Sequence, residues 1–266
     1  MLSICDLPED TLMEVLYHLS CNDLVLRCRL VCTQWKDIID SSILWKRKCL
    51  RQGYISKKCI KDPPDWKMLY YICHFKHNLL KNPSAEDEFD CWEKISDGGD
   101  CWRVEDLPGD HGKAFPGDQV KKYFVTSYGM CEKLQIIDLN EVGYRQELMD
   151  IAQPEIRIKD WFAARHDCGC RYTMEVQLLD ENHQILQEFC SDTITIEQWS
   201  DAEWRTMEHT FRNYGPGVRY ISFQHGGSDT QNWAGWYGVR VTNSSVTLEP
   251  EDLSTDPLPL SSGPSS

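Results

Sequence analysis

The sequence predicts an α+β protein in which short N-terminal helices precede an antiparallel β-sandwich. Apolar residues recur at helical spacing up to about residue 81, whereas short runs with alternating polar and apolar residues prevail from Trp92 onward. The charge changes at the same place, because residues 1–81 carry 13 Lys and Arg against 9 Asp and Glu and residues 82–266 carry 15 against 33. The formal charge of −14 disfavours general binding to nucleic acid or to anionic membranes.

The first fifty residues predict three short helices. An apolar stripe runs through residues 12–19, a second helix begins after Ser20, and a third begins after Ser41-Ser42. A domain this small buries little area, so its surplus apolar surface either packs on the rest of the chain or docks on another protein. The helical character continues through residues 49–88, with a buried helix at 68–72, which predicts a rigid spacer because the segment is not Gly/Ser-rich.

The remainder predicts a β-sandwich of the jelly-roll kind, because many short strands alternate with turn signals. The strand-like runs are 122–126, 156–159, 172–178, 219–224, 240–242 and 246–248. The turn signals are 97–100, 110–112, 214–217 and 225–227, and a helical turn is expected at 147–150. Six tryptophans beside strand-like runs are expected to be structural, namely Trp92, Trp102, Trp161, Trp199, Trp204 and Trp236.

Trp233 differs from these, because it lies in a Gly- and polar-rich loop without alternating partners. An exposed indole near carboxylates and amides suits sugar binding, since the ring stacks on a pyranose while short polar groups hold its hydroxyls.

The N-terminal residues resemble an F-box. The resemblance rests on Leu7-Pro8-Glu9-Asp10, Leu12-Met13-Glu14-Val15-Leu16, Cys28 through Trp35, and Leu44-Trp45-Lys46. It implies docking on the Skp-type adaptor of a cullin–RING ubiquitin ligase. The residues expected on or beside that contact are Leu7, Pro8, Leu12, Val15, Leu16, Leu30 and Val31.

The C-terminal residues resemble the F-box-associated (FBA) domain, through residues 98–105, 120–128, 159–165, 215–220 and 235–245. The joined architecture is similar to the sugar-recognising F-box proteins over about residues 3–250, and implies a galactose-binding-like sandwich. The expected domains are an F-box at 1–48, a helical linker at 49–88, the FBA sandwich at 89–250 and a disordered tail at 251–266.

This resemblance implies a receptor for the inner chitobiose core of high-mannose N-glycans on misfolded glycoproteins, acting in ubiquitination and ER-associated degradation. The implied glycan-binding residues are Tyr128, Asp167, Trp233 and His111, together with Asn232 and Ala234. Asn232 stands where an aromatic residue is usual, and Ala234 stands where one member has Lys.

Two other functions stay open. The sandwich could recognise protein clients and ignore sugar, or the chain could be a chaperone-like lectin with a self-packed F-box.

No catalytic function is expected. The sequence lacks a nucleophile elbow, an H-E-x-x-H pattern and a phosphate-binding loop, and no cofactor is implied. The 13 cysteines are scattered, and Cys168-Gly169-Cys170 without a second pair is a poor zinc site, so no metal is expected. The N-terminus lacks the pattern of a signal peptide, which predicts a cytoplasmic protein with reduced thiols.

Overall fold

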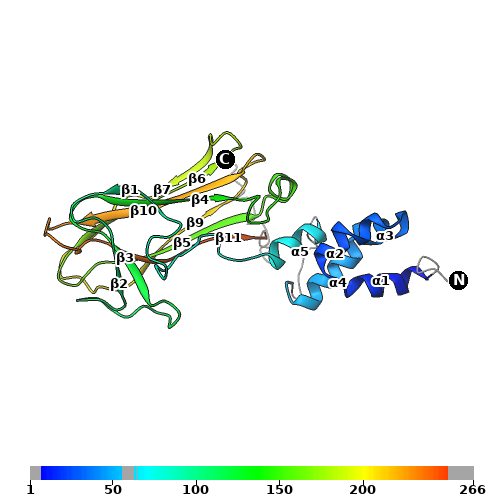
Figure 1. Cartoon of the computed structure of the whole chain (residues 1–266), viewed down its shortest axis with the longest axis horizontal. Helices are drawn as coiled ribbons and strands as arrows, with labels where there is room; N and C mark the ends of the chain where they lie inside the picture. The colour runs from blue at the N-terminus through cyan, green and yellow to red at the C-terminus, as the bar shows by residue number, and fades with distance from the viewer. Residues whose placement is uncertain (1–6, 56–62, 64, 251–266) are drawn as a thin grey trace, which may run out of the picture. The chain divides into compact units, whose positions relative to one another are not determined.

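The computed structural model describes residues 7–55, 63 and 65–250 of the chain (Figure 1). The chain divides into two compact units, of which the first reaches Phe75 and the second runs from Lys76 to Glu249. The predicted tail at 251–266 and the first six residues lie outside the described part. None of the helices in the described part combines the length and the apolar character that a membrane span requires.

The first unit contains five α-helices and a 3₁₀ turn within its described residues, which confirms the predicted helical character. The expected count of three helices in the first fifty residues is wrong, because the segment after Ser20 is divided into two α-helices and the 3₁₀ turn instead of forming one helix. Ser20 caps α2 as expected, because its hydroxyl accepts a hydrogen bond from the amide of Asp23 at 3.1 Å. The elements are α1 (Glu9–Tyr17), α2 (Cys21–Leu26), η2 (Cys28–Leu30), α3 (Thr33–Asp40), α4 (Ser42–Gln52) and α5 (Trp66–His74).

A single apolar core joins these helices. Leu12, Leu16 and Trp45 are fully buried in it, and Trp66 and Tyr70 of α5 join the same core. Lys48 of α4 lies at the C-terminal end of α1, where its ammonium group donates to the carbonyls of Tyr17 and Leu19 at 2.9 and 2.7 Å. A cation at this position satisfies carbonyls that have no partner at a helix end.

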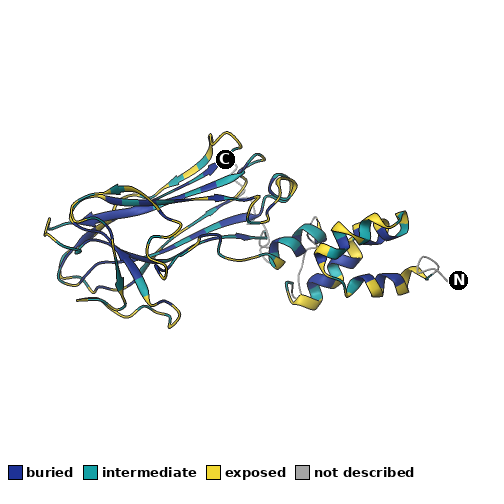
Figure 2. Cartoon of the chain, in the orientation of Figure 1, coloured by how far each residue is buried: buried dark blue, intermediate teal, exposed yellow. Residues whose placement is uncertain are grey.

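The second unit is the predicted antiparallel β-sandwich, built from two sheets. One sheet has the order β1-β4-β10-β6-β7, with β8 also paired to β6, and the other has the order β2-β3-β11-β5-β9. The strands are β1 (Glu93–Asp97), β2 (Arg103–Asp106), β3 (Lys122–Val125), β4 (Cys131–Asp138), β5 (Glu155–Ala163), β6 (Cys170–Leu179), β7 (Ile185–Cys190), β8 (Ile194–Ile196), β9 (Arg205–Phe211), β10 (Tyr220–Asp229) and β11 (Arg240–Glu249). Buried residues follow the inner strands, whereas exposed residues gather in the loops (Figure 2).

Most of the predicted local structure is confirmed. The predicted strand runs lie in β3, β5, β6, β10 and β11, and the predicted helical turn is the π-turn η3 (Leu148–Ala152). The turn expected at 225–227 is wrong, because β10 continues to Asp229. A Cβ atom on Gly226 would lie 2.0 Å from the carbonyl oxygen of Cys131, so this glycine permits close approach of β4 and β10.

The helical character expected through residue 88 ends at His74. Residues 76–92 instead lie on the sandwich, where the amide of Leu79 donates to the carbonyl of Val246 at 2.8 Å. The side-chain amide of Gln135 accepts from the Lys81 amide at 2.8 Å and donates to the Lys81 carbonyl at 3.0 Å. These hydrogen bonds to a sheet replace those that a continued helix would supply.

A polar cluster lies inside the sandwich. The carboxylate of Asp160 accepts from the hydroxyls of Tyr172 and Ser244, each at 2.7 Å, and lies 2.5 Å from Nδ1 of His225. Lys133 is also fully buried, and its Nζ lies 3.1 Å from the ring centroid of Trp92. In the described part of the chain, Nζ of Lys133 and Nε2 of His225 have no hydrogen-bond partner.

Candidate functional site

The loops that carry the predicted glycan-binding residues emerge at one end of the sandwich. Arg240, which begins β11, pairs with Val125 at the end of β3 and with Ala163 at the end of β5. In the other sheet, Asp229 at the end of β10 pairs with Cys170 at the start of β6. The loops β3–β4, β5–β6 and β10–β11 therefore lie together, and they carry Tyr128, Asp167, Asn232, Trp233 and Ala234.

A buried carboxylate fixes the turn that presents Trp233. The two oxygens of Asp229 accept from the amides of Asn232 and Trp233 at 2.6 and 3.2 Å. Asn232 has φ +57°, a backbone conformation that Asn tolerates better than most residues. The turn thus holds the indole in place through the backbone and leaves 40% of Trp233 exposed.

Aromatic and cationic contacts connect Trp233 to Asp167. The ring of Trp233 meets the ring of Tyr237 edge-on, with centroids 5.6 Å apart. The guanidinium of Arg165 lies 4.5 Å from the centroid of Tyr237 and donates to both oxygens of Asp167, at 2.9 and 3.1 Å. This two-pronged hydrogen bonding fixes the orientation of the carboxylate.

The electrostatics of this group keep Asp167 ionised. Burial by itself raises the pKa of the carboxyl, but the hydrogen bonds and charge of Arg165 and the charge of a protonated His111 outweigh it, so the pKa lies below the ordinary value. Nε2 of His111 lies 3.8 Å from Oδ2 of Asp167. The result is a fixed negative acceptor at neutral pH, which is suited to hydroxyl donors.

The loop that carries His111 is held to the same end. The guanidinium of Arg240 donates to the carbonyls of Pro108 and Asp110, at 3.2 and 2.5 Å. The carbonyl of His111 accepts from the amide of His166 at 2.9 Å. These contacts bring His111 beside Asp167, although 56 positions separate them in the sequence.

Tyr128 joins the group through its neighbour Ser127. The carbonyl of Ser127 accepts from the amide of Asp229 at 3.0 Å, which ties the Tyr128 loop to the Trp233 turn. Gly99 permits the close approach of the β1–β2 loop, because a Cβ atom there would lie 3.2 Å from the Tyr128 ring and 2.7 Å from the Ser127 hydroxyl. Tyr128 itself is 37% exposed.

The structure therefore brings Trp233, Asp167 and His111 into one network, with Tyr128 tied to it through the backbone and Asn232 and Ala234 exposed on the same turn. The sequence reasoning did not single out Arg165, Tyr237 or Asp229. The sequence does contain an indication of the role of Asp229, since an Asp a few residues before an Asn often accepts backbone hydrogen bonds in a turn.

The expectation that Trp199 is structural is wrong, because 66% of this residue is exposed. Trp92, Trp102 and Trp204 are buried as expected, whereas Trp161 and Trp236 are partly buried and pack on a core cluster.

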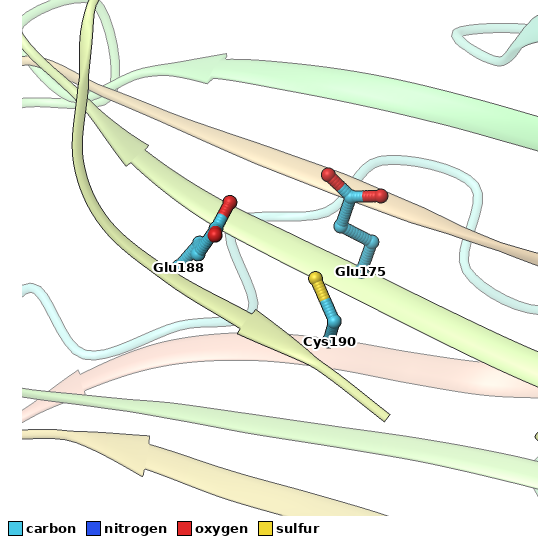
Figure 3. A group of neighbouring side chains, drawn as sticks. All are labelled: Glu175, Glu188 and Cys190. Carbon is cyan, nitrogen blue, oxygen red and sulfur yellow. The ribbon is translucent and has the colours of Figure 1, made fainter. Parts of the chain in front are cut away.

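A second group of polar side chains lies on β6 and β7, away from these loops. Glu175, Glu188 and Cys190 offer ligand atoms that all lie within 4.8 Å of one another. Figure 3 shows these three side chains close together. Glu175 and Cys190 also border an open depression of about 260 Å³. Burial and the two carboxylates raise the pKa of the Cys190 thiol. Exposed acidic groups commonly lie this close together without an ion, so we assign no ion to this group. Likewise, burial raises the pKa of Cys168 to about 11 and that of Cys170 to about 12.

The predicted adaptor-binding residues of the first unit fall into two sets. Leu12 and Leu16 are fully buried in the helical core, so their side chains are not presented to a partner in this conformation. Pro8, Val15, Leu30 and Val31 are exposed, and Leu7 is partly so. Helical periodicity identifies an apolar face but does not distinguish the residues that pack inward from those at its border.

Comparison with known proteins agrees with these two units. The family model of the F-box domain matches residues 4–47, and the family model of the F-box associated region matches residues 70–248. The chain is 55% identical to human F-box only protein 44, over 93% of this chain and 97% of that protein, and 53% identical to bovine F-box only protein 6, over 93% and 94%. Among solved structures, TmCBM61 in complex with β-1,4-galactotriose overlaps 65% of this chain and 99% of its own, with 17% identity and a TM-score of 0.41, which indicates a partial overlap only. The chain belongs to the F-box proteins that carry a C-terminal F-box associated region.

Proposed function

We propose that this chain is the substrate-recognition subunit of an SCF-type cullin–RING ubiquitin ligase and that its sandwich binds the chitobiose core of high-mannose N-glycans. The clients are misfolded glycoproteins that reach the cytoplasm for ER-associated degradation. The observation that carries the glycan assignment is the half-exposed indole of Trp233 on a backbone-anchored turn, linked by contacts to the ionised carboxylate of Asp167.

The network suits a neutral, hydroxyl-rich ligand. An exposed indole offers a flat face for the apolar side of a pyranose, and Asp167 offers an acceptor that needs no reorientation. Because the positive charge of Arg165 balances the negative charge of that carboxylate, the site does not require a cationic ligand. The exposed ring of Tyr128 adds a second aromatic surface.

The first unit supports the ligase role. Among the residues of this unit that the structure describes, five large apolar side chains are exposed, namely Val15, Leu26, Leu30, Val31 and Ile43. Exposed apolar side chains in so small a helical unit favour docking on a Skp-type adaptor. Ubiquitin transfer would then belong to the recruited RING protein and conjugating enzyme, and this chain would hold the client.

The test is a calorimetric titration of the full chain with chitobiose and with a high-mannose glycan. We expect saturable binding that Trp233→Ala abolishes, while capture of the Skp-type adaptor is unchanged. Ile151→Ala is a matched control, because Ile151 is an exposed apolar residue of η3, outside the glycan-binding loops. Absence of binding at millimolar sugar would overturn the glycan assignment and leave the ligase role intact.

A receptor for protein clients is the second candidate. Asn232 and Ala234 favour it, because they replace an aromatic ring and a donor at exposed positions of the Trp233 turn. This candidate predicts that clients without N-glycans are captured and that Trp233→Ala has little effect on them. A pull-down of one client in glycosylated and enzymatically deglycosylated forms distinguishes the two candidates.

A further inference from the structure

Trp199 is the most exposed large apolar residue of the second unit apart from Ile151. It lies on the β8–β9 loop with φ +65°, a conformation that is strained for a bulky side chain. Strain and an exposed indole both oppose stability, and strained residues concentrate at functional sites. The combination suggests that Trp199 is displayed for binding.

Hydrogen bonds hold this loop to the residues around Asp167. The amide of Trp199 donates to the carbonyl of His166 at 2.8 Å, and the side chain of Gln198 donates to the carbonyl of Asp167 at 2.9 Å. Nδ1 of His166 lies 2.5 Å from the carbonyl oxygen of Ser200. The rings of His166 and Trp199 then meet edge-on, with centroids 5.8 Å apart. Trp199 is therefore fixed beside the predicted glycan site.

The order of the strands gives the spacing between the strand ends that lead to the two exposed indoles. β10, which leads to Trp233, pairs with β6, and the start of β6 pairs with β8, which leads to Trp199. Adjacent strands lie about 4.8 Å apart, so the ends of β10 and β8 are about 10 Å apart. The β5–β6 loop with Asp167 lies between them. Short oligosaccharides can span such a distance.

We propose that Trp199 is a second stacking platform, which binds a mannose ring of the same glycan whose chitobiose core lies at Trp233. This inference rests on the proposed function. It assigns the β8–β9 loop to recognition of the sugar beyond the core, and it makes Trp199 a determinant of preference for extended glycans over chitobiose alone.

The surroundings of Trp199 favour a saccharide over a peptide. In residues 164–169 and 197–204, all of which the structure describes, Trp199 is the one large apolar side chain that is exposed. Its neighbours are short polar groups such as Ser200 and Asp201. A single ring among polar groups matches one face of a pyranose, whereas an apolar peptide segment needs a groove with several apolar contacts.

The experiment measures binding of chitobiose and of a free high-mannose glycan to the full chain by calorimetry. Trp199→Asn removes the ring and suits the positive φ, whereas Trp199→Tyr keeps an aromatic ring. We expect Trp199→Asn to weaken binding of the high-mannose glycan about tenfold and to leave chitobiose binding unchanged, since one aromatic contact contributes about that factor. Trp199→Tyr should restore most of the loss, and Ile151→Asn should have no effect.

Other outcomes overturn the inference in distinguishable ways. If Trp199→Asn binds both sugars like the unsubstituted chain, the second platform is wrong and the proposed function stands. If the substitution weakens binding of a glycopeptide but not of the free glycan, Trp199 contacts the peptide and the saccharide assignment is wrong. If the unsubstituted chain binds neither sugar, the proposed function and this inference both fail.

Discussion

Replacing the buried Lys133 with Met should stabilise the sandwich. Lys133 on β4 is fully buried, and its Nζ lies 3.1 Å from the ring centroid of Trp92 and 3.8 Å from that of Phe124. Burial lowers the pKa of this ammonium well below its ordinary value, and the charge of Asp160 offsets only part of the effect. Met has a similar length and no polar atom that needs a partner.

The magnitude follows from three competing contributions. A buried polar group without a hydrogen bond costs about 1–3 kcal/mol. The attraction between an ammonium and two aromatic rings opposes this with about 2 kcal/mol, but only in the fraction of molecules that keep the proton. A methionine sulfur against the same rings contributes about 0.3–1.5 kcal/mol. We therefore expect Lys133→Met to raise the free energy of unfolding by about 1–2 kcal/mol at pH 7.

The effect should depend on pH in a defined direction. In the unfolded chain a lysine binds its proton below about pH 10.4, whereas the folded chain binds it only below the lowered pKa. Between these two values the unfolded state carries more protons, so Lys133 makes stability rise with pH up to about 10.4. Lys133→Met removes this slope, and its stabilising effect should shrink as the pH approaches 10.

The assay is urea unfolding of the full chain at pH 7 and 9.5, with hydrogen exchange of the β4 and β10 amides reporting on the sandwich. Lys133→Gln is the matched control, because it keeps unpaired polar atoms and should not stabilise. A loss of 1 kcal/mol or more in Lys133→Met at both pH values would refute the reasoning, because the cation–π contacts would then outweigh the cost of burial.

Three further predictions concern the two units. Arg165→Met should weaken chitobiose binding about tenfold in calorimetry, since losing a hydrogen bond to a charged group costs about 1.5–3 kcal/mol. Arg165→Lys should recover only part of the loss, because Lys lacks the planar fork. Unchanged binding in Arg165→Met would contradict this prediction. Chitobiose affinity should stay constant within about threefold between pH 5 and 8, because the lowered pKa of Asp167 keeps the carboxylate charged in this range. A larger loss of affinity at pH 5 would show that binding depends on another titrating group. In the first unit, Leu30→Glu should abolish adaptor capture in a pull-down and leave the melting curve unchanged, whereas Leu16→Ala should destabilise the helices by about 2–5 kcal/mol. Adaptor capture by Leu30→Glu at the unsubstituted level would exclude Leu30 from that contact.

Local sequence patterns predicted those helices and strands that bury only one face. The alternation in β6 and the buried helix expected at 68–72, which lies within α5, are both confirmed, because burial on one side imposes a period on the residues. Lys133 is an exception to this pattern. A lysine in an alternating strand usually marks the solvent side, yet the pairing of β4 with β1 and β10 places it among aromatic rings inside the sandwich.

The candidate site was only partly predictable for a related reason. The loop position of Trp233 could be inferred from its polar and glycine neighbours, whereas the exposure of Trp199 depends on contacts with residues more than thirty positions away. The amide of Trp199 reaches the carbonyl of His166, and the guanidinium of Arg240 reaches the β2–β3 loop. Hydrogen bonds of this kind leave no periodic trace in a sequence.

The way Asp229 holds the Trp233 turn has a consequence for how such a binding loop diversifies. Its carboxylate anchors backbone amides, so residues 232 and 234 contribute no side chain to that anchoring. Selection can therefore sample side chains at these two positions while the indole keeps its place. A library randomised at 232 and 234, with Asp229 retained, should yield a high fraction of folded variants that differ in the ligands they prefer.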